Sequence, residues 1–297
     1  MTDSGVVIVD KPADWTSHDV VGRVRRLART RRVGHAGTLD PMATGVLVLG
    51  IEKGTKLLGH LALTEKVYEA TLRLGLTTTT DDAEGEPGVR ADAAAVGDDA
   101  VRTGTAALTG AIQQIPPQVS AIKVNGVRAY KTARAGGEVE LKARTVTVSE
   151  FAVGEIRRSV DPGGTFIDVD ARITCSSGTY IRALARDLGA ALGVGGHLTA
   201  LRRTRVGPYE VSQARTLDRL AEDFTTVPLA RAVAEAFPVR VLSADEARKV
   251  AHGNRISPGG LGPGPIGLFD PDGSVVALAE ERPGYSKPTV VFAPAGG

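Results

Sequence analysis

The sequence predicts a globular protein built from both α-helices and β-strands, with a small β-rich module at its C-terminal end. Hydrophobic residues make up 42% of its 297 residues and charged residues 24%, as in ordinary globular proteins. Alternating apolar residues at 66–76 and 165–174 predict strands, whereas helical spacing after Ser17 predicts a helix. Beyond residue 238, short apolar segments separated by Pro/Gly turns predict the β-rich module.

The first half of the chain alternates between strands, helices and two loops. Ser17 is expected to cap the first helix, because Val20, Val21, Val24 and Leu27 follow it at helical spacing. Segment 34–45 is rich in glycine and has no hydrophobic period, so we expect a loop there, and the acidic, Gly- and Pro-containing segment 81–99 is expected to be a second loop. The predicted strands are 5–9, 46–49 and 66–76, and a second helix is predicted over 98–109.

The second half of the chain begins with an Asn125-Gly126 turn signal between apolar residues. A domain boundary is expected between 224 and 238, where the composition shifts. In the C-terminal module, Ser243 and Glu246 form a capping-box pattern and Asp270 to Gly273 a turn. The other predicted elements are a short helix at 128–135, strands at 144–153, 165–174 and 239–242, and a helix at 179–192.

Composition excludes several classes of protein. A single cysteine, Cys175, rules out a disulfide scaffold. No two of the five histidines have helical ligand spacing, so we expect no metal site, with carboxylate-rich magnesium binding as the alternative left open. The longest apolar stretches are too short to cross a bilayer, and the N-terminus lacks the basic and apolar regions of a signal peptide. We therefore expect a cytoplasmic protein with no membrane association.

Charge is distributed unevenly along the chain, although its net value is only +2. Residues 11–35 hold seven basic and two acidic side chains, whereas 81–99 hold seven acidic side chains and one arginine. Arginine provides 27 of the 36 basic residues. This asymmetry suggests a polyanionic partner, with an ordinary solvated helix face as the alternative.

Three segments are candidates for chemistry. Segment 34–45 gathers an Asp, a His and several glycines without a hydrophobic period, and is either a ligand loop or a surface loop. Segment 175–189 runs from a predicted strand into a helix whose start carries Arg182, which either pairs with an anion or is solvated. Segment 195–207 carries three arginines that suit a phosphate backbone or a solvated edge strand. Cys175 is expected to be a buried thiol, since no histidine is near in sequence.

Taken in order, these segments resemble the TruB family of tRNA pseudouridine synthases. The resemblance covers about residues 5–210. It rests on DKPADWTSHDVV at 10–21, GHAGTLDPMATGVLVLG at 34–50, and KVY at 66–68 with the residues up to Asp81. It also rests on IPPQVSAIKVNG at 115–126 with YKTAR at 130–134, on 178–189 and on 195–203. The C-terminal module resembles the RNA-binding PUA domain of bacterial members.

The resemblance implies an α+β pseudouridine synthase fold with a mixed, largely antiparallel sheet and a catalytic cleft. Residues 1–225 would form the catalytic domain, with an RNA-gripping insertion at about 112–150, and 238–297 a PUA-like domain. The implied reaction is the isomerisation of uridine 55 in the tRNA T loop to pseudouridine. No cofactor is needed for it.

The resemblance also assigns roles to individual residues. Asp40 would be the catalytic carboxylate, kept ionised and oriented by Arg182. Tyr68 would stack on the flipped uracil and help to remove its C5 proton. His35 would contact the bases displaced by flipping. Tyr180 and Leu201 would line the uracil pocket, with Gly37 and Thr38 also contributing to substrate binding.

RNA phosphates would be bound by basic side chains, which set affinity rather than the choice of base. The tRNA partner would be held at its T arm and, through the PUA-like module, at its acceptor end. We expect a monomer with no obligate protein partner. The side chains expected at RNA phosphates are Arg23, Arg26, Lys123, Arg202, Arg203 and Arg205.

Two other functions are weighed against this one. The first is a non-catalytic tRNA-binding protein or folding chaperone on the same scaffold, which would not need Asp40, Tyr68 and Arg182 together. The second is a hydrolase that uses Asp40 and His35. Mass separates the two chemistries, because conversion of uridine to pseudouridine changes no mass and hydrolysis does.

Overall fold

The computed structural model describes residues 3–119, 123–124, 127–128 and 141–292, with backbone alone at 123–124 and 127–128. The chain folds into two compact units. The first contains residues 1–40, 46–63 and 206–297, and the second contains 41–45 and 64–205. Within the described residues, no helix has both the length and the apolar composition that a membrane crossing requires.

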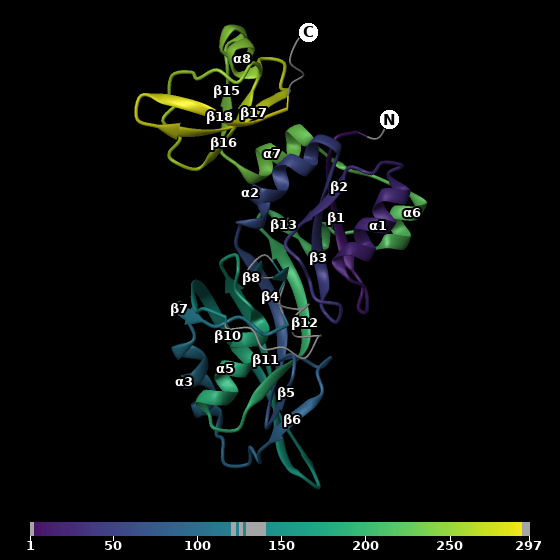
Figure 1. Ribbon diagram of the computed structural model, residues 1–297, viewed down its shortest axis with the longest axis vertical. Helices are drawn as coiled ribbons and strands as arrows, with labels where there is room; N and C mark the ends of the chain where they lie inside the picture. Colours follow the sequence, from purple (N-terminus) through teal and green to yellow (C-terminus); the bar gives the residue numbers. More distant parts are fainter. Residues whose placement is uncertain (1–2, 120–122, 125–126, 129–140, 293–297) are drawn as a thin grey trace. The chain divides into compact units, whose positions relative to one another are not determined.

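The first unit contains a sheet in which strand β1 lies between β14 and β3. Strand β2 is antiparallel to β3, and Figure 1 shows β1, β2 and β3 together. The strands are β1 (Gly5–Lys11), β2 (Val33–Ala36), β3 (Thr44–Ile51, of which Val46 onward belongs to this unit), β13 (Tyr209–Glu210) and β14 (Val227–Pro228). The helices are α1 (Ser17–Leu27), α2 (Leu58–Ala62), α6 (Leu217–Glu222) and α7 (Leu229–Ala236), with short 3₁₀ helices at Glu52–Leu57 and Val211–Gln213.

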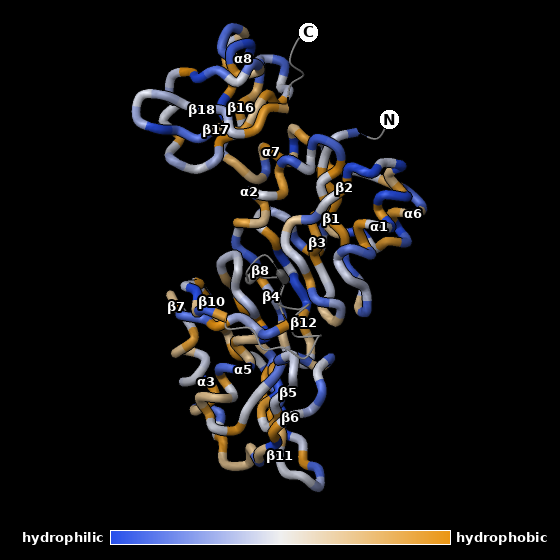
Figure 2. The backbone as a smooth tube through the Cα atoms, in the orientation of Figure 1, coloured by the Kyte–Doolittle hydropathy of each residue, from blue (hydrophilic) through white to orange (hydrophobic). Residues whose placement is uncertain are grey.

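Both faces of this sheet are buried, which explains why its strands read as continuous apolar runs. Val7 and Val9 of β1 share a core cluster with Val20 and Val24 of α1. The alternate β1 residues belong to a second cluster, together with residues of α7. The hydrophobic colour along β3 in Figure 2 marks residues that alternate between the same two clusters.

The C-terminal part of the first unit is a four-stranded sheet in the order β15-β16-β17-β18, covered by one helix. Strands β15 and β16 are parallel and the other pairs are antiparallel. The predicted capping box of Ser243 and Glu246 is confirmed, and so is the turn at Asp270, whose side chain accepts the Ser274 N–H at 2.8 Å. The elements are β15 (Val239–Val241), α8 (Ala244–Ala251), β16 (Pro265–Phe269), β17 (Val275–Arg282) and β18 (Tyr285–Val291).

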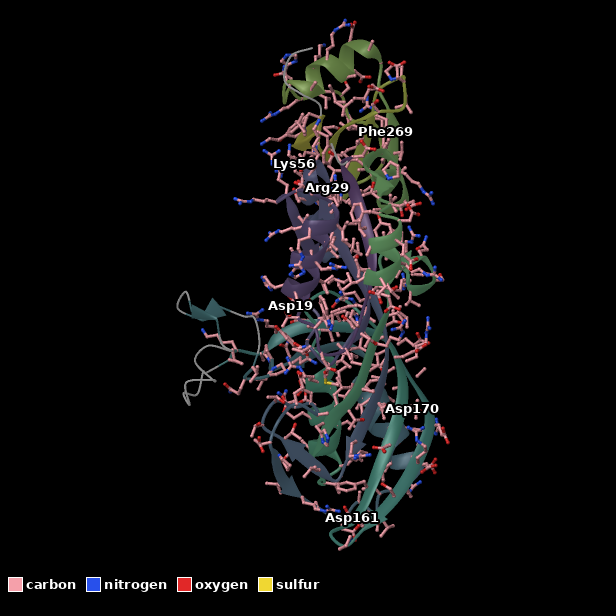
Figure 3. All side chains as sticks on the ribbon, turned by 90° about the vertical axis from the view of Figure 1, so that its right-hand side faces the viewer. Asp19, Arg29, Lys56, Asp161, Asp170 and Phe269 are labelled. Carbon is pink, nitrogen blue, oxygen red and sulfur yellow. The ribbon has the colours of Figure 1, made fainter. Side chains whose placement is uncertain are left out.

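The second unit contains a sheet in the order β12-β4-β11-β10-β7. Its antiparallel β10–β11 hairpin carries Asp161 at its tip and Asp170 further along β11 (Figure 3). Other strands are β4 (Lys66–Leu74), β5 (Leu76–Thr78), β6 (Pro87–Arg90), β7 (Gly110–Gln114), β8 (Lys123–Val124), β9 (Val127–Arg128), β10 (Arg144–Asp161), β11 (Gly164–Cys175) and β12 (Gly196–Val206). The helices are α3 (Asp98–Ala107) and α5 (Ile181–Ala191).

One parallel pairing makes this sheet mixed. Thr44 and Gly45, the first residues of β3, pair with Arg202 and Arg203 of β12. A Cβ on Gly45 would lie 2.2 Å from the Arg203 carbonyl oxygen, and the Gly45 φ is +97°. Only glycine fits that backbone approach and conformation. β12 therefore lies inside the sheet, between this pairing and β4, and the alternative of a solvated edge strand is wrong.

Three local predictions need correction. Segment 34–45 is not all loop, since its ends belong to β2 and β3. The cap of α1 is Thr16 rather than Ser17, and Thr16 forms a full capping box with Asp19. Segment 81–99 is not all loop, since it contains the exposed strand β6 paired with β5. The Asn125-Gly126 turn and almost all of the predicted 128–135 helix lie outside the described residues, although the flanking Val124 and Val127 pair as hairpin strands.

Candidate active site

The loop that carries Asp40 connects β2 to β3 and is held by a buried serine. The Ser17 hydroxyl accepts the Leu39 N–H at 2.9 Å and donates to the Leu39 carbonyl at 3.1 Å. Ser17 is 1% exposed and Leu39 is 4% exposed. One side chain therefore satisfies both backbone groups of the residue that precedes Asp40. The sequence did not reveal this role, because a serine at a helix start is ordinarily read as a cap.

Replacing Ser17 by alanine is expected to lower both stability and the rate of the reaction assigned below. The change leaves a buried N–H and a buried carbonyl without their partner, which costs about 1–3 kcal/mol of unfolding free energy. Urea unfolding and a single-turnover assay measure the two effects. The exposed Ser212→Ala is the control. Wild-type values for both quantities in Ser17→Ala would show that this hydroxyl does not hold the loop.

His35 of β2 lies beside a histidine that the sequence analysis did not single out. The rings of His18 and His35 meet edge to face, with centroids 5.7 Å apart and an interplanar angle of 78°. His18 is exposed and His35 is half-buried. Asp40 and Gly37 are also half-buried, whereas Thr38 is exposed. The first unit thus brings His35, Gly37, Thr38 and Asp40 onto one short segment of backbone.

Tyr68 lies in the second unit, on β4, opposite Ile173 of β11, and its side chain is 7% exposed. Lys66, on the same face of β4, is 5% exposed, and its burial, aided by Arg203, lowers its pKa to about 8. Cys175 lies opposite Lys66. Burial raises the Cys175 pKa to about 11, so the thiol stays protonated at neutral pH, as expected of a structural cysteine.

Arg182, in the first turn of α5, contacts a carboxylate and backbone carbonyls of the second unit. Its Nη1 lies 3.2 Å from the Asp82 carboxylate and donates to the Thr80 carbonyl at 2.8 Å. Its Nη2 donates to the Val119 carbonyl at 2.9 Å. The Arg182 side chain is 5% exposed and that of Asp82 is 3% exposed. The guanidinium is therefore fixed in orientation by a buried ion pair and two backbone groups.

Asp82 is the functional candidate that sequence reasoning missed. It was counted among the seven acidic residues of a predicted surface loop, yet it is 2% exposed. Its carboxylate accepts hydrogen bonds from the Thr80 hydroxyl and from the Glu84 N–H. The only sequence signal was local: Thr80 and Glu84 flank Asp82 at two residues on each side, a spacing that suits an aspartate-capped turn.

A second arginine of α5 lies one turn after Arg182. Arg186 contacts the Asp81 carboxylate at 3.1 Å and donates to the Ile115 carbonyl at 2.7 Å. Burial raises the Asp81 pKa, against the opposing effect of Arg186.

At the start of the helix, the Gln114 amide bonds both the N–H and the carbonyl of Tyr180. Tyr180 is thereby fixed, and Leu201 of β12 is 8% exposed.

The predicted phosphate-binding side chains differ in accessibility. Arg26 is exposed and Arg23 is half-buried, both on α1. Arg202 donates to the Thr44 hydroxyl at 3.2 Å, and Arg205 pairs with Glu65 at 2.6 Å. Arg203 is 1% exposed, so it could reach a phosphate only after rearrangement. Lys123 lies on β8, where the structure describes backbone alone.

The site residues fall into two groups. His35, Gly37, Thr38 and Asp40 belong to the first unit, whereas Tyr68, Tyr180, Arg182 and Leu201 belong to the second. Within the part of the chain that the structure describes, no three His, Cys, Asp or Glu side chains are placed to hold a metal ion. The second group consists of two aromatic rings, an apolar side chain and an oriented cation, which suits a planar base beside a negatively charged group.

Comparison with protein families gives three consecutive matches along the chain. Residues 25–181 match the TruB family pseudouridylate synthase N-terminal domain. Residues 182–233 match the tRNA pseudouridylate synthase B C-terminal domain. Residues 237–293 match the C-terminal domain of tRNA pseudouridine synthase II. The first match alone covers more than half of the chain.

Similar proteins extend over almost the whole chain. The tRNA pseudouridine synthase B of Thermobifida fusca is 73% identical over 97% of this chain and 98% of its own. That of Streptomyces coelicolor is 59% identical over 98% of both. Among solved structures, an H/ACA RNP bound to a substrate RNA that contains 2′-deoxyuridine has a TM-score of 0.72 at 26% identity, covering 98% of this chain and 85% of that one. A Cbf5-Nop10-Gar1 complex gives 0.70 at 28%, covering 98% and 84%.

Proposed function

The chain belongs to the TruB family of pseudouridylate synthases and is a tRNA pseudouridine synthase, and we propose that Asp40, Arg182 and Tyr68 carry out its reaction on uridine 55 of the T loop. The observation that carries the function is the near full-length match to tRNA pseudouridine synthase B at 73% identity. The test is to incubate the purified protein with an unmodified tRNA transcript and to map pseudouridine in the product. We expect pseudouridine at position 55 and no change in the mass of the RNA. Pseudouridine elsewhere than position 55 would overturn the assigned target.

The reaction exchanges one glycosidic bond for another. The C1′–N1 bond of the target uridine breaks, uracil turns over in the site, and a C1′–C5 bond forms. The C5 proton leaves and N1 ends protonated, so the product is an isomer of the substrate. The enzyme must hold the detached base, supply a negatively charged group during the exchange and accept the C5 proton.

Asp40 is the proposed negatively charged group. A carboxylate can act as nucleophile or base only when it is ionised. Ser17 fixes the peptide that precedes Asp40 through two hydrogen bonds to Leu39, which limits the positions open to the carboxylate. Such fixed geometry is what a near-attack arrangement requires.

Arg182 is the proposed counter-charge of Asp40. Its guanidinium is 5% exposed and its two terminal nitrogens are both directed by acceptors, so its charge has a defined position. A buried cation near a carboxylate favours the ionised form of that carboxylate. Because Asp82 already neutralises part of the Arg182 charge, the attraction on Asp40 would be moderate, and the carboxylate would remain reactive.

Tyr68 is proposed to stack on the detached uracil and to help remove the C5 proton. Its ring lies on the largely apolar face of β4 and is 7% exposed. Tyr180 and Leu201 would complete the pocket. The target base must leave the T-loop stack to reach these groups. His35 would then contact the bases that flipping displaces, and its edge-to-face packing on His18 orients the ring.

The T arm is proposed to lie against Arg23 and Arg26 of α1 and against Arg202 and Arg205. Residues 238–297 are proposed as a PUA-like domain that holds the acceptor end, and residues 1–225 as the catalytic domain. We expect the protein to act as a monomer in the cytoplasm, without an obligate protein partner. The separate family match of residues 237–293 supports this division.

Binding of tRNA is expected to weaken steeply as salt rises, because phosphate contacts release counterions. Arg26→Ala should lower the affinity and reduce the slope of log K against log salt by about 1. Filter binding or anisotropy from about 50 to 200 mM salt measures both. Arg231→Ala is the control, since Arg231 is paired with Glu235 on α7. An unchanged slope in Arg26→Ala would remove this residue from the RNA contact.

A further inference from the structure

The first residues of β12 join the helix that carries Arg182 to the segment that holds its guanidinium. Gly196 lies against α5 so closely that a Cβ there would be 2.7 Å from the Ala185 carbonyl oxygen. The next two residues, His197 and Leu198, contact segment 76–82. That segment returns to α5 through the ion pair of Asp82 and Arg182. The contacts therefore form a closed ring around the Arg182 side chain.

His197 and Leu198 fix the two ends of segment 76–82. The His197 Nδ1 is 2.8 Å from the Leu76 carbonyl oxygen, and the Leu198 N–H donates to the Asp81 carbonyl at 3.0 Å. Asp82 and Leu198 also form an isolated parallel bridge. Between these anchors, the Thr78 hydroxyl donates to the Asp82 carbonyl at 2.7 Å. These contacts hold segment 76–82 against β12 at both of its ends. They thereby set the position of the Asp82 carboxylate.

The tautomer of His197 follows from its partner. A carbonyl oxygen only accepts hydrogen bonds, so Nδ1 carries the proton and donates it to Leu76. The ring is 5% exposed, and burial lowers the His197 pKa, so the neutral form is present at physiological pH. The charged groups that act on the ring are Arg73 of β4, Asp168 of β11 and Asp82. A protonated ring would attract Asp82 and compete with Arg182 for it.

From this geometry we infer that His197 is a positioning residue for catalysis. By donating a hydrogen bond to Leu76, it holds segment 76–82 in position. Through Asp82, it keeps the Arg182 guanidinium in the orientation that the reaction uses. The inference rests on the proposed role of Arg182. It assigns function to a histidine that motif reasoning treated as part of an arginine-rich strand.

Asparagine and glutamine separate this role from simple packing. An asparagine amide nitrogen occupies the position of Nδ1 and can donate to Leu76, whereas a glutamine amide reaches the position of Nε2. We expect His197→Gln to lower the single-turnover rate by about 10- to 100-fold, as expected of a displaced catalytic group, with an unchanged Kd for tRNA. His197→Asn should stay within about 3-fold of wild type, because the donor is preserved. The control is His252→Gln, which removes an exposed histidine with the same Nδ1 contact, 2.8 Å from the Arg248 carbonyl.

Several results would overturn the inference. Equal rates for His197→Asn and His197→Gln, or a loss that disappears after correction for the folded fraction, would show a packing role only. A double-mutant cycle with Asp82→Asn should be non-additive, since both changes act on one segment, and additive losses would contradict the coupling. Arg182→Lys in the same assay separates the two hypotheses. If that variant is fully active the proposed role of Arg182 fails, whereas if only His197→Gln is fully active this inference alone fails.

The pH dependence of stability gives a second readout. Because the folded state disfavours protonated His197, the unfolded chain binds this proton more readily. The contribution of neutral His197 to the unfolding free energy is therefore complete above the unfolded histidine pKa of about 6.5. This contribution is lost as the pH falls below that value toward the lowered pKa of the folded state. His197→Asn should reduce the decline in unfolding free energy over this acid range. An unchanged decline would show that His197 does not titrate in this way.

Discussion

Replacing Asp40 by asparagine is expected to abolish pseudouridine formation while tRNA binding stays at the wild-type level. The amide keeps the size of the side chain and one acceptor oxygen, but it replaces the other oxygen by a donor NH2 group and removes the negative charge. We expect the single-turnover rate to fall by at least about 10³-fold, as for the loss of a group that takes part directly in bond making. Binding should persist, because phosphate contacts provide most of the affinity for RNA.

The Asp40 measurement needs one matched control and two readouts. Asp218→Asn removes an exposed carboxylate in the same unit and should leave the rate unchanged. Rapid mixing with tRNA gives the rate, and filter binding gives the Kd. Turnover of Asp40→Asn at the wild-type rate would refute the assignment. A parallel loss of binding and rate would instead place Asp40 in RNA recognition.

Replacing Arg182 by lysine is expected to lower the rate by about 10²- to 10³-fold with little effect on tRNA affinity, a size typical of losing one fixed electrostatic contact in the transition state. Lysine keeps the charge but not the planar fork. In the structure, the two terminal nitrogens of Arg182 serve different acceptors, Nη1 reaching Asp82 and Thr80 and Nη2 reaching Val119. A single ammonium group cannot satisfy this set in the same geometry.

Arg219→Lys is the control for this substitution. Arg219 is exposed and pairs with Glu222 on the surface of α6, so the change should be silent. Circular dichroism and urea unfolding check that Arg182→Lys folds, because a buried ion pair with a shifted charge can be destabilising. A folded Arg182→Lys with the wild-type rate would show that charge alone is sufficient and that the oriented guanidinium is not used.

Much of the secondary structure was predictable, because its signals are local. The alternation of residues 66–74 predicted both β4 and its buried face, on which Lys66, Tyr68 and Leu72 all lie. The capping box at Ser243 predicted the start of α8. The prediction of Ser17 as the helix cap was wrong, because a serine that precedes an amphipathic stretch has the same local signature whether it caps the helix or bonds a distant residue. Thr16 takes the cap, and Ser17 bonds Leu39, which is 22 residues away.

The residues of the candidate site could be predicted only where they lie in a recognisable sequence motif. The resemblance named Asp40, Tyr68 and Arg182 from the residues around each. It did not indicate Asp82 or His197, whose importance depends on partners about 100 residues away in the chain. The local charge pattern predicted the exposure of Asp82 wrongly, because the six other acidic residues in 81–99 made Asp82 resemble a solvated loop residue.

The amino-acid sequence by itself determined the family, the chemistry and most of the strands and helices, because these depend on residue identity and on spacings of two to four residues. Only the tertiary structure decided which polar groups are buried and which partners they share. Burial and pairing arise when strands and helices distant in sequence pack together, as β12 and segment 76–82 do around Arg182. An aspartate, a serine or a histidine acquires a positioning role only after water is excluded and its hydrogen bonds are made to other protein groups.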